Sequence, residues 1–137
     1  MSDSSYFIAI PFIRKDNSMT DSTKFKAELT VFMLVKTKPE WLAMPVEDRF
    51  KQLRTHVEPL LKKHEGEVRM RFFDTEFYSA RVTDLWMWDA KTHHAWQLLA
   101  EDLRETPFWD GYFDVVEILT GIENAYADNY NQRALSA

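Results

Sequence analysis

The chain has 137 residues, 45% of them hydrophobic and 15% aromatic, a size and composition that suit one well-packed domain. It contains no cysteine, which excludes disulfide frameworks, thiolate nucleophiles and cysteine-ligated metal centres. Seventeen basic and 22 acidic residues give a net charge of −5, which argues against binding to a nucleic-acid backbone.

The first element in chain order is a short apolar run at residues 6–13. Basic residues come after this run and not before it. That order is wrong for a secretory signal, and no apolar run in the sequence is long enough to span a bilayer. We therefore expect a cytoplasmic protein with no membrane partner. Residues 14–28 are polar and aperiodic, so residues 1–27 are interpreted as an N-terminal extension. Two interpretations stay open: the true start is Met19, or the run at 6–13 pairs with a sheet edge or a partner subunit.

A central strand and a long amphipathic helix are predicted next. Residues 29–35 are apolar on both faces, which is typical of a central strand, and Pro39 ends the segment. Residues 46–64 carry apolar side chains at steps of three and four, as an amphipathic helix does. Pro59 is expected to kink or break its last turns, and Gly66 to stop it. The apolar stripe consists of Val46, Phe50, Leu53, Val57, Leu60 and His64.

The second half of the chain mostly alternates with a period of two, which is typical of strands with one buried face. Strands are predicted at 67–73, 82–88 and 112–119, and helices at 92–105 and 122–130. In the strand 82–88, Asp84, Trp86 and Trp88 share one face, while Thr83, Leu85 and Met87 share the other.

The element order β-α-β-β-α-β predicts an α+β fold of the ferredoxin-like type. A single domain is expected over residues 28–130, followed by a tail at 131–137. Because both faces of the strands carry large apolar side chains, we expect a homodimer that packs sheet against sheet as a dimeric α+β barrel. The expected interface is the face bearing Trp86 and Trp88 or its neighbours.

Several runs of this sequence resemble the darcynin family of small bacterial proteins, over about residues 28–130. They are LTVFMLVKT at 29–37, PEWL at 39–42, RFFD at 71–74, ARVTD at 80–84, EDLRETPFW at 101–109, VVEIL at 115–119 and GIENAY at 121–126. The family has no settled activity, so the resemblance implies a grouping and carries over no catalytic residues.

Charged side chains within the predicted sheet are candidates for a ligand site. Arg69 and Arg71 share a strand face, and inside a barrel they would need carboxylate partners or a bound anion. An internal salt bridge is the favoured interpretation, and Arg71 is expected to pair with Asp84 or with Glu117. Glu117 alternates with apolar residues, so it is either a base of raised pKa or, as we favour, a partner of an arginine. Their candidate carboxylate partners are Asp74, Glu76, Asp84 and Glu117.

Aromatic side chains supply the other part of the candidate site. Trp86, Trp88, Phe73 and Tyr78 offer walls for an aromatic or polyketide-like ligand, although core or dimer interface is the favoured interpretation. The full set of candidate pocket residues is Arg69, Arg71, Asp74, Tyr78, Arg81, Asp84, Trp86, Trp88 and Glu117.

The four histidines have no metal-ligand spacing, since His93 and His94 diverge on a helix and His56 and His64 lie two turns apart. We therefore expect no metal and no cofactor. Two functions remain open. One is a cofactor-free enzyme acting on an apolar or aromatic molecule inside the barrel, and the other is a non-catalytic ligand-binding or assembly protein. Catalysis would need an acid–base group inside the pocket, whereas binding would need only the aromatic walls and an arginine.

Overall fold

The computed structural model describes residues 25–135 of the chain. The expectations for residues 6–13 and for a start at Met19 lie outside these residues. The elements in chain order are β1 (Leu29–Thr37), α2 (Pro39–Leu42), α3 (Val46–His56), α4 (Glu58–Lys63), β2 (Val68–Asp74), β3 (Asp84–Ala90), α5 (His93–Arg104), β4 (Phe113–Gly121) and α6 (Ala125–Asn129). No helix among the described residues has the length and hydropathy needed to cross a membrane.

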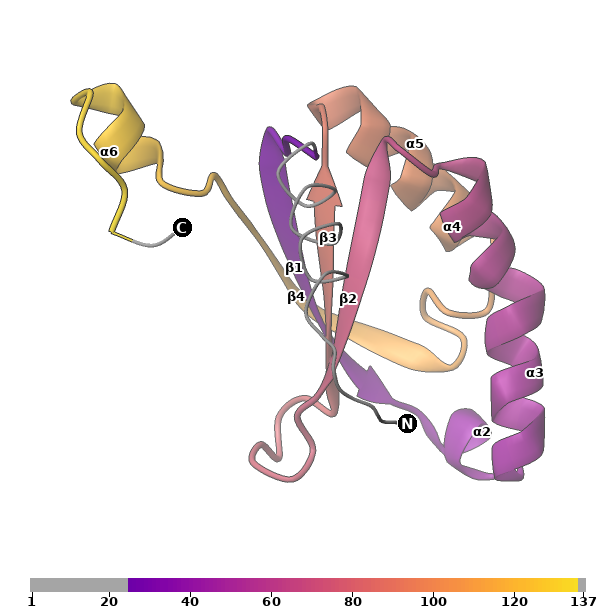
Figure 1. The fold of residues 1–137 in the computed structure, drawn as a ribbon. Helices are drawn as coiled ribbons and strands as arrows, with labels where there is room; N and C mark the ends of the chain where they lie inside the picture. Colours follow the sequence, from indigo (N-terminus) through magenta and orange to yellow (C-terminus); the bar gives the residue numbers. More distant parts are fainter. Residues whose placement is uncertain (1–24, 136–137) are drawn as a thin grey trace, which may run out of the picture.

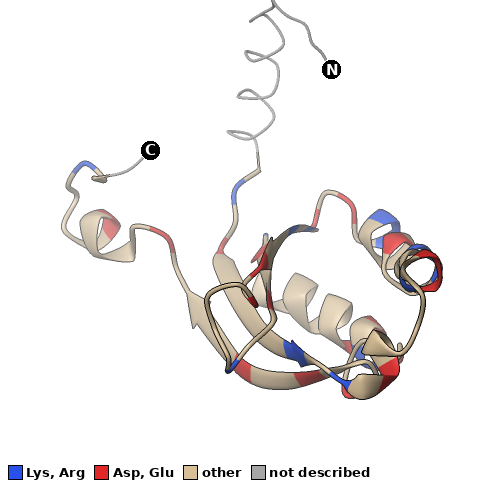
Figure 2. Ribbon diagram, turned by 90° about the horizontal axis from the view of Figure 1, so that it is seen from below, with Lys and Arg blue, Asp and Glu red and all other residues tan. Residues whose placement is uncertain are grey.

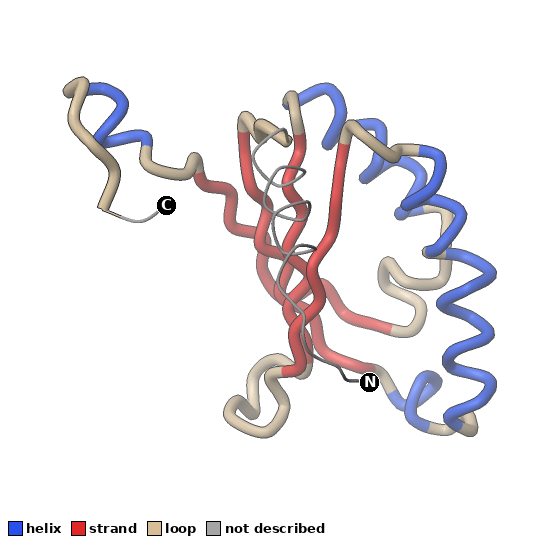
Figure 3. Tube along the Cα trace, viewed as in Figure 1, coloured by secondary structure: helices blue, strands red, loops and turns tan. Residues whose placement is uncertain are grey.

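The four strands form one antiparallel sheet in the order β2-β3-β1-β4. Helices α3, α4 and α5 all lie on one side of this sheet (Figures 1 and 3). A sheet of this order with both crossover helices on one face is the ferredoxin-like arrangement, so the predicted α+β fold is confirmed.

The proline residues set the boundaries of the first helices. The break expected at Pro59 is confirmed, because α3 ends at His56 and α4 begins at Glu58. The helix α2 was not predicted, since Pro39 was interpreted only as the end of a strand. A proline is well tolerated in the first turn of a helix, where its missing N–H has no intrahelical partner to lose, and Pro39 begins α2 in this way.

The core lies between the sheet and the helices, and its centre is aromatic. Trp86 and Trp88 of β3 are 1% and 0% exposed. The ring of Trp86 lies 5.6 Å from that of Phe113 and 5.9 Å from that of Phe108, and the ring of Trp88 lies 6.0 Å from that of Trp96. The expectation that the face bearing both tryptophans forms a dimer interface is therefore wrong, because helices of the same chain cover it.

The opposite face of the sheet is not covered by any of these helices, and we call it the open face. It is formed by Phe32 and Leu34 of β1, Leu85 and Met87 of β3, Arg69, Arg71 and Phe73 of β2, and Glu117 and Leu119 of β4. Phe73 is 39% exposed and Leu119 is 49% exposed. Figure 2 shows charged bands on the strands as well as on the helices, separated by long uncharged stretches of the sheet. The apolar character predicted for both faces is therefore present.

The short helix α6 projects away from the sheet at the end of β4 (Figures 1 and 2). Its rings of Tyr126 and Tyr130 pack edge to face with centroids 5.1 Å apart. The two tyrosine rings therefore cover part of each other's apolar surface.

A tight loop after α5 gives a first test of the fold. A methyl group at Gly111 would lie 2.5 Å from the backbone oxygen of Pro107, whereas one at Gly121 would meet only the ring of Phe32 at 3.9 Å. We expect Gly111→Ala to lower the free energy of unfolding by about 1–3 kcal/mol. Gly121→Ala, the matched control, should change it by less than about 0.5 kcal/mol. Urea unfolding followed by tryptophan fluorescence measures both, and equal effects would contradict this loop geometry.

Candidate functional site

A hollow with a volume of about 730 Å³ lies between α3–α4 and the β2–β3 side of the sheet. Its helix wall is formed by Val46, Phe50 and Leu53 of α3, together with Val57 and Leu61. Its sheet wall is formed by Met70, Phe72 and Trp86, and Trp41 and Phe113 contribute at one end. The walls are therefore largely apolar and rich in aromatic rings.

The backbone of α3 packs mainly on α4 and has few close contacts with the strands, so its apolar side chains can line a cavity (Figure 1 shows how these elements are arranged). No residue of α3 is buried. Val46 is 60% exposed and Phe50 is 51% exposed, although both belong to the apolar stripe predicted from the sequence. In most amphipathic helices such a stripe packs on the core, whereas here Val46 and Phe50 line the cavity, while Leu53 both lines it and packs against the core.

Polar contacts fix α3 at its N-terminal end. The guanidinium of Arg49 donates to the carbonyl oxygens of Trp41, Met44 and Leu42, at 3.1, 3.0 and 3.0 Å. These carbonyls belong to α2 and the turn after it, so Arg49 ties the two helices together. The Tyr112 hydroxyl donates to the side-chain oxygen of Gln52 at 3.0 Å, which attaches α3 to the loop before β4.

A buried histidine ties α4 to α5 at the other end of this helix pair. His64 is 8% exposed, and its Nε2 lies 2.8 Å from Oδ2 of Asp102, to which Lys63 also donates at 2.8 Å. Hydrogen bonds from Lys63 and then His64 hold the pKa of Asp102 below its ordinary value. The sequence placed His64 on an apolar stripe and contained no signal for a partner 38 residues away.

One end of the cavity is acidic. Asp74 of β2 and Asp84 of β3 are directly opposite each other in the strand register, and Glu76 lies just beyond them. Asp84 is 5% exposed, and the Thr83 hydroxyl donates to its Oδ2 at 2.7 Å. Among residues 25–135, none of the three carboxyl groups forms an ion pair.

Burial is the main reason that the pKa of Asp84 rises from 3.8 to about 6. The nearby carboxyl groups of Asp74 and Glu76 raise it further, and the hydrogen bond from Thr83 opposes the rise. The cavity therefore contains an acid that exchanges its proton just below neutral pH.

The candidate residues predicted from the sequence divide into separate groups in the structure. Asp74, Asp84 and Trp86 come together on the cavity wall, whereas Trp88 is buried in the core. Tyr78 is 93% exposed in the connection between β2 and β3.

The three arginines predicted as site residues, Arg69, Arg71 and Arg81, lie outside the cavity, on the open face or beside it. Arg69 lies 3.4 Å from Asp89 and its guanidinium stacks over the ring of Phe25. Arg71 stacks over Phe73, and Arg81 lies 3.4 Å from Glu117 with both side chains largely exposed.

Two expected contacts are wrong for reasons of register. Arg71 is opposite Met87 on the open face, while Asp84 points to the helix side, so the two cannot pair. A bulge in β4 inserts Val116, because Leu34 is opposite Glu117 and Val35 is opposite Val115. Glu117 therefore leaves the face of Val115, and it contacts Arg81 rather than Arg69 or Arg71.

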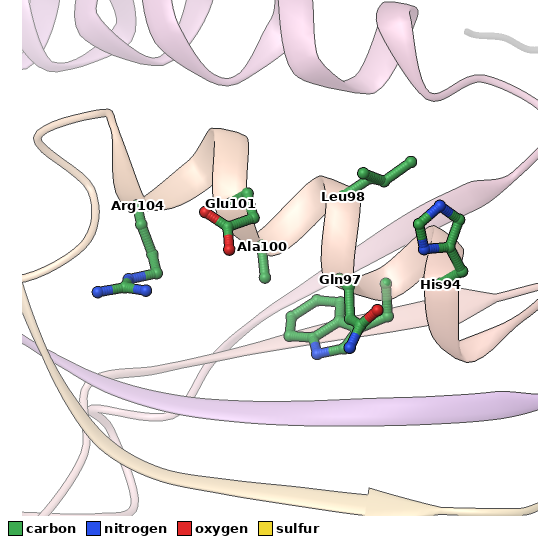
Figure 4. Close-up of a pocket in the computed structure, with 7 residues that line it drawn as sticks. His94, Gln97, Leu98, Ala100, Glu101 and Arg104 are labelled. Carbon is green, nitrogen blue, oxygen red and sulfur yellow. The ribbon is translucent and has the colours of Figure 1, made fainter.

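A smaller hollow of about 380 Å³ lies along the outer side of α5. All seven of its lining residues belong to that one helix, and Figure 4 shows them spread along it from His94 at one end to Arg104 at the other. Because no second element forms an opposing wall, this hollow is a surface groove and a weaker candidate. Residues 25–135 contain no group of three or more histidine or carboxylate side chains placed to hold a metal ion.

Comparisons with known proteins give a family but no activity. A family profile described as "Darcynin, domain of unknown function" matches residues 14–137. A darcynin homolog from Granulibacter bethesdensis is 64% identical over 113 residues, which are 82% of this chain and 91% of that protein. A second darcynin homolog, from Streptomyces avermitilis, is 59% identical over 102 residues, covering 74% of this chain and 84% of that protein.

Solved structures share the fold at low sequence identity. Chlorite dismutase from Candidatus Nitrospira defluvii, in complex with imidazole, aligns with a TM-score of 0.62 and 17% identity over 74% of this chain. A structure described as a novel heme-binding protein from Thermus thermophilus aligns with a TM-score of 0.62 and 13% identity over 71% of this chain. The alignments span only 43% and 40% of the lengths of those two chains, so they bear on the fold alone.

The buried carboxyl of Asp84 gives a testable effect on stability. A raised pKa in the folded state means that ionisation opposes folding, so stability falls as pH rises between about 4 and 6. We expect Asp84→Asn to remove this loss and to raise the free energy of unfolding at pH 8 by roughly 1–3 kcal/mol. At pH 4.5, where Asp84 is protonated in the folded protein, the gain should be much smaller. Urea unfolding at both pH values measures the difference.

Asp102→Asn is the matched control, because its carboxylate is stabilised by Lys63 and His64. That variant should lose stability at pH 8. If Asp84→Asn destabilises the protein equally at both pH values, the interpretation of Asp84 as a buried acid without an ion-pair partner is contradicted.

Proposed function

The chain belongs to the darcynin family, and we propose that it binds a small, largely apolar molecule in the cavity between α3–α4 and β2–β3. The observation that carries this proposal is the apolar stripe of α3, in which Val46 and Phe50 line a cavity of about 730 Å³ and stay more than half exposed, while Leu53 reaches the core. Small-molecule sites in proteins commonly have volumes of about 300–1,000 Å³ and mainly apolar walls.

The energetics favour an occupant for this cavity. Apolar side chains left in contact with water forgo the roughly 25 cal/mol per Å² that burial contributes. Val46 and Phe50 could recover this stabilisation by closing onto the sheet, but Arg49 and Gln52 hold their helix in place. A molecule that fills the space would bury these side chains without requiring the helix to move.

Asp84 supports catalysis as a second candidate function. A general acid or base works best with a pKa near the operating pH, and the pKa of Asp84 is about 6. The buried carboxyl beside aromatic walls therefore suits a cofactor-free reaction that moves a proton. Binding alone would not require such a group.

Haem does not fit this cavity, although two of the solved structures with this fold are a chlorite dismutase and a heme-binding protein. Of the side chains that usually serve as axial ligands, the cavity wall contains the thioether of Met70 but no histidine, cysteine or tyrosine. The buried His64 is not part of the wall, and its Nε2 is occupied by Asp102. Three carboxyl groups at one end would also repel haem propionates.

The open face supports a homodimer packed sheet against sheet, but not a ligand site between the two sheets. Its apolar centre is continuous across β1 and β3, and exposed patches of this kind usually mark interfaces. A two-fold axis parallel to the strands would place β2 of one protomer over β4 of its partner. That axis would place Arg71 on β2 over Leu119 on β4, two residues along the strand from Glu117, so the two edges carry opposite charge.

Ligand binding can be tested with naphthylethanol, a neutral aromatic probe, by isothermal titration calorimetry. We expect measurable binding to the full chain. Leu53→Trp, which fills the helix wall of the cavity, should weaken it at least about tenfold, equivalent to about 1.4 kcal/mol. Leu98→Trp on the outer side of α5 is the control and should bind normally. No binding by the unmodified chain, or equal binding by both variants, would overturn the proposal.

Sedimentation velocity at micromolar concentration tests the dimer. We expect the unmodified chain to sediment as a dimer and Met87→Asp, on the open face, to sediment as a monomer because a buried charge has no partner there. Leu98→Asp, which also adds a charge but lies on α5, should remain dimeric. A compact monomer for the unmodified chain would rule out this interface.

A further inference from the structure

The acidic end of the cavity is unbalanced in charge. Asp84 is 5% exposed, and its carboxylate accepts a hydrogen bond from the Thr83 hydroxyl. Among residues 25–135, no basic side chain donates a hydrogen bond to it. Asp74 lies opposite it in the register, and Glu76 also lines the cavity. A buried carboxylate without a counter-ion is costly, so this end of the cavity favours an occupant that brings positive charge.

The basic residues of the cavity wall do not supply that charge. The guanidinium of Arg49 is committed to three backbone carbonyl groups on α2 and the following turn. Arg54 also lines the cavity, but its side chain is exposed to solvent and its guanidinium stacks over the ring of Phe50 at 5.7 Å. Glu58 at the start of α4 adds another acidic group to the wall.

An inorganic cation does not suit the site either. The described residues contain no set of three or more ligating side chains placed to hold a metal ion. The rest of the wall is apolar and would leave a hydrated ion without partners. A body with aromatic or aliphatic surface is needed to fill the remaining volume.

We propose that the cavity is a site for a hydrophobic organic ammonium ion, with its charged group at Asp84 and its apolar body between α3 and the sheet. This inference rests on the proposed binding function and adds the chemical class of the ligand. An ammonium group donates three hydrogen bonds, which suits the cluster of Asp74, Glu76 and Asp84. The ring of Phe72, which lines the cavity and is 47% exposed, adds cation–π attraction.

The site should depend on pH. The charged and titratable groups that line the cavity with Asp84 are Asp74 from β2, Glu76 from the connection to β3, and Arg49, Arg54 and Glu58 from the helices. Burial and the two neighbouring acids raise the pKa of Asp84 to about 6. An alkylammonium group has a pKa near 10 and stays charged throughout this range. Ammonium binding should therefore strengthen as pH rises from 5 to 7.5, as Asp84 ionises.

Three probes with the same aromatic body separate charge from shape: naphthylethylamine, naphthylethanol and naphthylacetate. At pH 7.5 we expect the full chain to bind the amine at least about tenfold more tightly than the alcohol, and the acetate most weakly. Asp84→Asn should remove this preference by weakening the amine alone. Asp74→Asn, at the exposed rim, should weaken the amine less, and Glu101→Gln on α5 is a control that should change nothing.

The outcomes distinguish this inference from the binding function on which it rests. If the alcohol binds as tightly as the amine, or the acetate binds best, the ammonium assignment is overturned while the cavity remains a binding site. If none of the three probes binds, the proposed function fails as well. An amine preference that Asp84→Asn leaves intact, or that does not weaken at pH 5, would place the charged group elsewhere and overturn the inference.

Discussion

The separation of α3 from the sheet is the constraint on which the rest of the site depends. Two kinds of contact maintain it. Arg49 and Gln52 fix the helix through polar contacts to α2 and to the loop before β4, and His64 fixes the following helix to α5. Trp41 acts as an aromatic spacer at one end, with its ring 5.3 Å from that of Phe113 and 5.4 Å from that of Phe108. These contacts are all made with the helix in this position, so the cavity is part of the packed structure.

The fold could be predicted because it follows from periodicity, which is a local property. The alternation of β3 and the stripe of α3 both predicted the correct element type, and Pro59 predicted the correct break. Which sheet face the helices cover could not be predicted, since both faces of β1 and β3 are apolar. The bulge at Val116 moves Glu117 to the other face of the sheet, and the alternation of polar and apolar residues in the sequence does not reveal it. The errors at Trp88 and Glu117 share this cause: side-chain direction depends on long-range packing and register.

The candidate site was recovered only in part, and the missed part is the helix wall. Asp74 and Asp84 are predicted as carboxylate partners of the strand arginines, and Trp86 as an aromatic wall, and all three line the cavity. Their location was expected between two sheets, whereas they line a cavity within one protomer. The stripe of α3 looked like ordinary core, because amphipathicity shows that a helix has an apolar face but not what touches that face.

The fold alone therefore does not determine what the cavity binds. Chlorite dismutase shares the sheet and its helix layer at 17% identity, yet the wall residues decide what a cavity can hold. Here the wall combines aromatic rings with an unpaired carboxyl cluster and lacks a histidine. In the proposed assembly the open face would take the partner subunit, and the helix side would remain accessible to a ligand. Because the strand alternation sends Asp84 and Met87 to opposite faces, charge changes in the cavity need not disturb the interface.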